Sequence, residues 1–69
     1  MSDTSHYTVT GMTCAHCVAS VTEEISDIPG VEAVSVDLPT GAVTVISEGL
    51  VDTAAVRAAV EEAGYRLAG

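Results

Sequence analysis

The sequence predicts an α+β fold in which a four-stranded antiparallel sheet carries two helices on one face. The 69-residue chain alternates between stretches with a period of two and stretches with helical spacing, in the order strand, helix, strand, strand, helix, strand. Turn sequences rich in proline and glycine separate these stretches. This βαββαβ order is the split βαβ arrangement, which places both helices on the same side of the sheet.

The first strand is expected over residues 6–10, where Tyr7 and Val9 alternate with polar neighbours. Residues 1–5 are polar and acidic, and we expect them to form a short disordered lead. Residues 6–69 are then expected to form a single domain, since no linker or low-complexity stretch interrupts them.

The first helix is expected over residues 16–28, after a loop at residues 11–15. Its apolar side chains recur at spacings of three and four, with polar side chains opposite, which is the pattern of an amphipathic helix. Pro29-Gly30 then ends the helix. The apolar positions are Val18, Val21, Ile25 and Ile28.

Two strands, at residues 31–38 and 42–47, are expected to pair through a hairpin turn at residues 39–41. Ile46 falls on the face opposite to its apolar neighbours, so it is either exposed or part of an irregular strand end. The positions expected to face the core are Val34, Val36, Leu38, Val43 and Val45.

The second helix is expected to begin after Asp52, a suitable N-cap residue, and to end before Gly64, a suitable C′ residue. Residues 65–67 are long enough for a closing edge strand. The apolar stripe of this helix consists of Ala55, Val56, Ala59, Val60 and Ala63.

The composition restricts the possible partners. The chain has ten acidic side chains against only Arg57 and Arg66, for a formal net charge of −8, which argues against nucleic acid or an anionic membrane as a partner. The start of the chain lacks a signal peptide, and no apolar run approaches the ~20 residues that span a bilayer. We therefore expect a cytoplasmic protein, in which thiols stay reduced.

Residues 11–17, Gly-Met-Thr-Cys-Ala-His-Cys, hold both cysteines of the chain. Cys14 lies in the expected loop and Cys17 in the first helical turn, where backbone N–H groups and the helix dipole favour the thiolate. Two thiolates suit a soft ion such as Cu(I). A closed zinc site needs four ligands, but His16 is the only further ligand near the two cysteines. His6 cannot complete such a site, because it lies roughly 15 Å along its strand from the loop.

Disulfide exchange is the alternative chemistry for this pair, since Cys-x-x-Cys also occurs in thioredoxin-like oxidoreductases. Those proteins have longer chains and a cis-proline facing the thiols. Pro29 and Pro39 instead belong to turns at the two ends of the second expected strand, which we expect to lie away from the thiols. A redox role, or an incidental pair of cysteines, is therefore less favoured than metal binding.

The cysteine motif, followed by Val18, Val21 and the Pro29-Gly30-Val31 turn, resembles the heavy-metal-associated domain family. This family includes small bacterial copper chaperones and the amino-terminal modules of copper-transporting P-type ATPases. The resemblance extends from about Tyr7 to Tyr65, and it implies the ferredoxin-like βαββαβ sandwich that the periodicity also predicts.

The resemblance implies a role for each residue of the motif. Cys14 and Cys17 match the paired Cu(I) ligands, and Met12 matches a methionine that packs beneath the loop rather than binding metal. Tyr65 matches an aromatic residue beside the site, where its hydroxyl approaches the ligands or its ring caps the core. His16 departs from the plainest motif; it is a bystander in the monomer or a ligand in a copper-bridged dimer.

The resemblance also implies a function. Zinc-selective relatives carry Asp immediately before the first cysteine, whereas this chain has Thr13, so copper is favoured. The expected protein is a cytoplasmic Cu(I) chaperone, not an enzyme, that passes copper by thiolate exchange to a copper-transporting P-type ATPase or a copper-responsive repressor. It is expected to be a monomer without copper and to form a copper-bridged homodimer. The alternative is an amino-terminal metal-binding module of such an ATPase.

Overall fold

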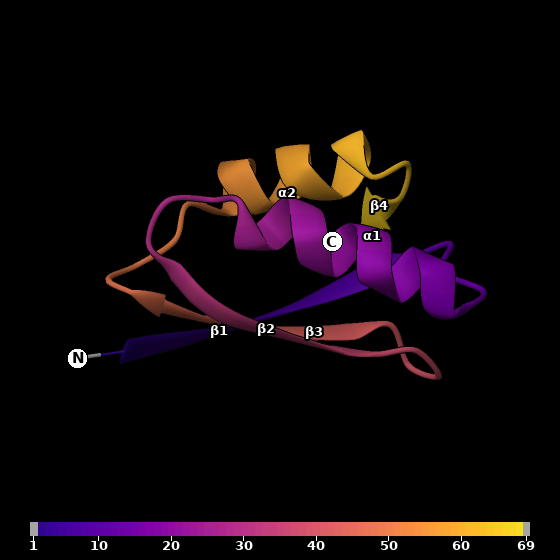
Figure 1. Ribbon diagram of the computed structural model, residues 1–69, viewed down its shortest axis with the longest axis horizontal. Helices are drawn as coiled ribbons and strands as arrows, with labels where there is room; N and C mark the ends of the chain where they lie inside the picture. Colours follow the sequence, from indigo (N-terminus) through magenta and orange to yellow (C-terminus); the bar gives the residue numbers. More distant parts are fainter. Residues whose placement is uncertain (1, 69) are drawn as a thin grey trace.

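The computed structural model describes residues 2–68 and confirms the predicted α+β class (Figure 1). The four strands form one antiparallel sheet in the order β2-β3-β1-β4, and both helices lie on the same side of it. The elements are β1 (Ser2–Thr10), α1 (Ala15–Ser26), β2 (Val31–Asp37), β3 (Ala42–Glu48), α2 (Thr53–Glu62) and β4 (Arg66–Leu67). This is the ferredoxin-like βαββαβ sandwich.

The expected disordered lead is wrong for residues 2–5, which belong to β1. Ser2 pairs with Glu48, and the pairing with β3 continues to Thr8 opposite Ala42. Polar side chains are compatible with this strand because the ladder of backbone hydrogen bonds to β3 orders it. Residue 1, which the same expectation covered, lies outside the described residues.

Other element boundaries differ from the prediction by one or two residues. Helix α1 ends at Ser26, so Ile28 lies in the following turn, where it still packs against the core. Strand β2 ends at Asp37, which places Leu38 in the hairpin. Strand β3 continues through Ile46 to Glu48, but its pairing with β2 shifts register there, with Ala33 opposite Ile46 and Val31 opposite Ser47. Ile46 is half-buried.

The core lies between the sheet and the two helices. Both helices contribute most of the residues that their spacing predicts, with Val21 and Ile25 on α1 fully buried. The predicted stripe positions Val18 and Ala55 are only half-buried and lie outside the core cluster. Ser47 is the one buried polar side chain among the described residues, and its hydroxyl donates a 2.7 Å hydrogen bond to the carbonyl oxygen of Gly49. The buried apolar cluster consists of Val9, Val21, Ile25, Val43, Val45, Val56, Val60 and Leu67.

Helix α2 has the predicted caps at both ends. The Asp52 carboxylate accepts a 3.0 Å hydrogen bond from the amide of Ala54. At the other end Gly64 has a φ of +94°, and the amide of Tyr65 donates to the Val60 carbonyl oxygen over 3.0 Å. This Schellman ending reverses the chain sharply, so that Tyr65 directly precedes β4.

Strand β1 is held on both sides just before the cysteine loop. The amide of Val9 donates a 2.8 Å hydrogen bond to Gly41 of the hairpin, and the amide of Ala68 donates a 2.7 Å bond to Thr8. Gly41 is required here because a Cβ atom would collide with the Val9 carbonyl oxygen. Among residues 2–68, no helix has the length and apolar character that a membrane crossing requires.

Candidate metal site

The two cysteines lie side by side at the start of α1. Cys14 occupies the N-cap position with extended backbone, and its side chain makes no capping hydrogen bond. The amide of Cys17 donates a 3.1 Å hydrogen bond to the Cys14 carbonyl oxygen, which closes the first turn. The two Sγ atoms are 3.4 Å apart and do not form a disulfide. The predicted pair therefore converges on one point.

The two thiols differ in exposure. Cys14 is exposed, whereas Cys17 is only 6% exposed and belongs to the buried face of α1. A partner molecule can thus reach the sulfur of Cys14 more easily than that of Cys17.

The pKa of the Cys17 thiol is lowered to about 6 by hydrogen bonds to its sulfur. The largest cause is a backbone hydrogen bond from Thr13, followed by the Tyr65 hydroxyl and the Cys14 thiol, and these outweigh the opposing effect of burial. The Thr13 hydroxyl also lies 3.9 Å from the Cys17 sulfur. Cys17 is therefore a thiolate at neutral pH, the form that binds metal.

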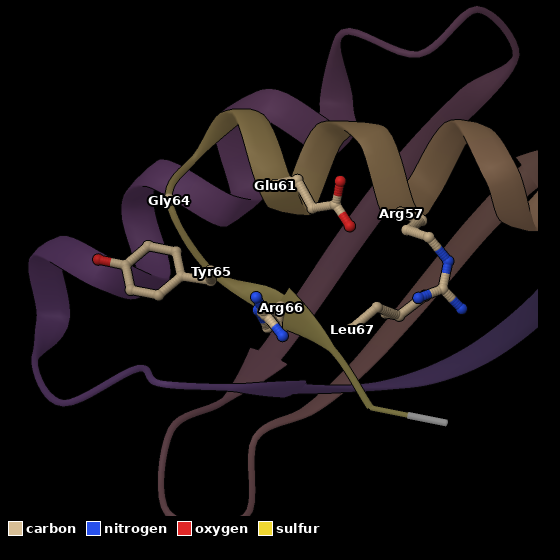
Figure 2. Close-up of a pocket in the computed structure, with 6 residues that line it drawn as sticks. All are labelled: Arg57, Glu61, Gly64, Tyr65, Arg66 and Leu67. Atoms are coloured by element: carbon tan, nitrogen blue, oxygen red, sulfur yellow. The ribbon is translucent and has the colours of Figure 1, made fainter.

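Tyr65 lies beside the cysteine loop, as the resemblance implied. Its ring turns away from the space between α2 and β4 and toward the start of α1 (Figure 2). A Cβ on Gly11 would lie 3.5 Å from the Tyr65 ring, so ring and loop are in close contact. Its hydrogen bond to Cys17 raises the pKa of the Tyr65 hydroxyl, because the phenol is then needed as a donor.

The other candidate residues lie apart from the sulfurs. Met12 is half-buried and packs against the apolar core. His16 is exposed, and within residues 2–68 no third His, Cys, Asp or Glu side chain joins the two cysteines in a metal-binding group. His6 lies on β1, where its Nδ1 is 3.3 Å from the Thr44 hydroxyl of β3. The described residues thus provide a site with two sulfurs.

The oxidoreductase alternative is not supported by proline geometry. No peptide bond in the described part of the chain is cis. The Pro39 turn reaches the loop end of the sheet, where the amide of Val9 donates a hydrogen bond to the carbonyl oxygen of Gly41.

Thr13 is a residue of the candidate site that the sequence did not indicate. Its identity entered the prediction only as the absence of an aspartate, whereas its backbone provides the main stabilisation of the Cys17 thiolate. The signal available in the sequence was its place directly before an N-cap, where backbone N–H groups have no helical partner.

The fold and the cysteine pair define a small domain of the metal-binding class. The sequence profile of the heavy-metal-associated domain matches residues 6–66, and the chain therefore belongs to that family. This match confirms the resemblance of the motif, and solved structures of the family share the fold.

Relatives of two kinds are similar to this chain. Copper-transporting ATPase 2 of Rhizobium meliloti (strain 1021) is 44% identical over 61 residues, which cover 88% of this chain and 7% of the ATPase. Copper chaperone CopZ of Bacillus subtilis (strain 168) is 38% identical over 61 residues, covering 87% of this chain and 88% of the chaperone. A solved structure described as a CopZ metallochaperone has a TM-score of 0.89 at 30% identity, covering 96% of this chain and all of that one.

Proposed function

We propose that this protein is a copper chaperone that binds one Cu(I) between Cys14 and Cys17 and passes it on by ligand exchange. The observation that carries the proposal is the pair of adjacent sulfurs, one exposed and one held as a thiolate, with no third ligand among residues 2–68. Soft thiolate ligands favour Cu(I), and the relatives include proteins named as copper chaperones.

Binding in a straight S–Cu–S line requires a small outward movement of Cys14. With metal–thiolate bonds of about 2.3 Å, the value for zinc, sulfurs on opposite sides of an ion lie about 4.6 Å apart. The Sγ atoms lie 3.4 Å apart. Cys14 moves more easily than Cys17, since it is exposed and its side chain makes no capping bond.

The difference in exposure also gives the order of ligand exchange. A thiolate of the partner reaches the metal from the side of exposed Cys14 and forms a third sulfur bond to copper. The bond to Cys14 then breaks, and the bond to Cys17 breaks last because its buried sulfur is the harder of the two for the partner to reach. Copper keeps its oxidation state throughout, and no catalysis is required of the protein.

The partner that fits this exchange is a domain with a Cys-x-x-Cys site of its own, such as that of a copper-transporting P-type ATPase. A copper-responsive repressor is a second candidate. We place the exchange in the cytoplasm, where thiols stay reduced.

The second candidate function is that of a metal-binding module within such an ATPase. It is favoured by the ATPase relatives, of whose length this chain matches only 4–7%. Both functions use the same two cysteines. Whether the reading frame continues into membrane-spanning segments in its source distinguishes them.

The decisive experiment is Cu(I) competition against a calibrated chelator under reducing conditions. We expect one Cu(I) per chain, with affinity lost when Cys14→Ser and Cys17→Ser are combined. Met12→Leu is the matched control, because a packing role tolerates a similar apolar side chain. A stoichiometry below one, or unchanged affinity in the double variant, contradicts the proposal.

A further inference from the structure

The two basic side chains of this acidic protein line the same hollow. Arg57 extends from α2 and Arg66 from β4 (Figure 2). They are the only basic residues in a chain with ten acidic ones. The hollow has a volume of about 500 Å³. Its lining residues are Arg57, Glu61, Gly64, Tyr65, Arg66 and Leu67.

The hollow is bordered by an open edge of the sheet. Strand β4 is the last strand on its side, and within residues 2–68 no further strand pairs with its outer edge. Such an edge presents backbone N–H and C=O groups that can pair with an extended segment of another chain. Helix α2 provides the opposite wall through Arg57 and Glu61.

The charge of the hollow selects the chemistry of such a segment. Its two arginines and one glutamate give it a net positive charge, in contrast to the −8 of the whole chain. Guanidinium groups form strong, directed hydrogen bonds with carboxylates. An acidic segment is therefore attracted to this edge, whereas a basic segment would face Arg57 and Arg66.

The hollow adjoins the candidate copper site through Tyr65. This residue lines the hollow, while its ring contacts the Gly11 position of the loop. A segment bound along β4 consequently lies next to the loop from which copper is transferred.

We propose that the hollow between α2 and β4 docks an extended acidic segment of the protein that exchanges copper with this chain. The purpose of the docking rests on the proposed copper exchange. The contact itself does not depend on bound copper, because its groups are the β4 edge and the two arginines rather than the two sulfurs.

The test is an NMR titration of the isotope-labelled full chain, without copper, with a short capped peptide of alternating glutamate and valine. We expect saturable shifts of the Arg66 and Leu67 amides and of both arginine side chains, weakening as salt is added. Arg66→Gln should reduce the affinity about tenfold, the loss of one charge-assisted hydrogen bond. Ser35→Glu is the matched control, since it changes net charge equally on the opposite edge strand β2 and should leave the affinity unchanged.

Several results would overturn the docking proposal. These are the absence of saturable shifts, shifts centred outside the hollow, or equal affinity in Arg66→Gln. Equal shifts with inorganic phosphate would show a site for small anions rather than for a polypeptide. Cu(I) competition on the native chain keeps the two proposals separate, because failure of that chain to bind copper counts against the chaperone function alone. Arg66→Gln should bind copper as the native chain does.

Discussion

Cys14 and Cys17 occupy chemically different environments although only two residues separate them. Cys17 is buried and receives hydrogen bonds from the backbone of Thr13 and from the Tyr65 hydroxyl, whereas Cys14 is exposed. In the proposed copper exchange, Cys17 retains the metal while Cys14 admits the incoming ligand. Tyr65 contributes to that difference and can be tested directly.

Replacing Tyr65 with phenylalanine should raise the pKa of Cys17 from about 6 toward that of an ordinary thiol. In the native chain the thiolate fraction, and with it the alkylation rate of Cys17, should rise with pH through about 6 and level off above it. In Tyr65→Phe the rise should begin at higher pH. Iodoacetamide labelling, resolved to each cysteine by fragmentation mass spectrometry, measures both profiles.

Tyr7→Phe is the control for this substitution, because it removes a hydroxyl from a half-buried ring on β1. The Cys17 profile should not change in that variant. A profile in Tyr65→Phe identical to that of the native chain would show that the phenol does not act on the thiolate.

His16→Ala should leave the binding of one Cu(I) intact and weaken copper-linked dimers. His16 is exposed and lies outside any group of three metal-binding side chains among the described residues, so we expect it to act where two molecules meet. Native mass spectrometry during a Cu(I) titration measures both species, with His6→Ala as the histidine control. Dimerisation equal to that of the native chain would exclude His16 from the shared site.

The sequence predicts the pair of cysteines but not all the interactions that stabilise the Cys17 thiolate. Spacing and the helix start are sufficient to expect a thiolate at Cys17, since both follow from local helix geometry. The contribution of Thr13 depends on the path of the loop, which begins with Gly11 at a φ of +94°. The contribution of Tyr65 depends on the fold, which brings together residues far apart in the sequence.

At the level of the elements, periodicity predicts the segments that bury one face and fails for those held by backbone pairing. Helix α2 agrees with its prediction at both caps, because Asp52 and Gly64 act locally. The first half of β1 was missed because its side chains are polar, and its partner β3 is distant in sequence. Long-range pairing of this kind leaves no mark in a local window of sequence.

Gly41→Ala should destabilise the protein by about 1–3 kcal/mol more than Gly49→Ala does. Both glycines have positive φ, of +75° and +84°, so both variants strain the backbone to a similar degree. Only at Gly41 does the added Cβ meet a neighbour, the carbonyl of Val9. Urea unfolding of both variants measures the difference, and equal losses would mean that the hairpin adjusts freely against β1.

For the whole molecule, the small core means that binding of the proposed copper ion would add a large part to the stability. Eight buried apolar side chains, none of them aromatic, form the central cluster. A domain of this size is only marginally stable. Ligands that bind the folded state therefore shift its unfolding markedly.

Saturating Cu(I) should raise the free energy of unfolding by up to about 2.7 kcal/mol at a free concentration one hundred times the dissociation constant. The unfolded chain can also bind copper, because its cysteines remain three positions apart. Such binding lowers the gain in the free energy of unfolding below this limit. Thermal unfolding monitored by circular dichroism measures the shift. The combined Cys14→Ser and Cys17→Ser variant should show none, and an equal shift there would place copper elsewhere.

The hydrogen bonds that hold β1 at Thr8 and Val9 have a mechanical consequence. They anchor the strand to β4 on one side and to the hairpin on the other, directly before Gly11. The stretch from Gly11 to Cys14 then acts as a short hinge between two fixed bodies, the sheet and helix α1. For the proposed copper exchange, an opening of the site within this stretch leaves the pairing of the sheet intact. Entry and release of copper would then cost only a few backbone torsions.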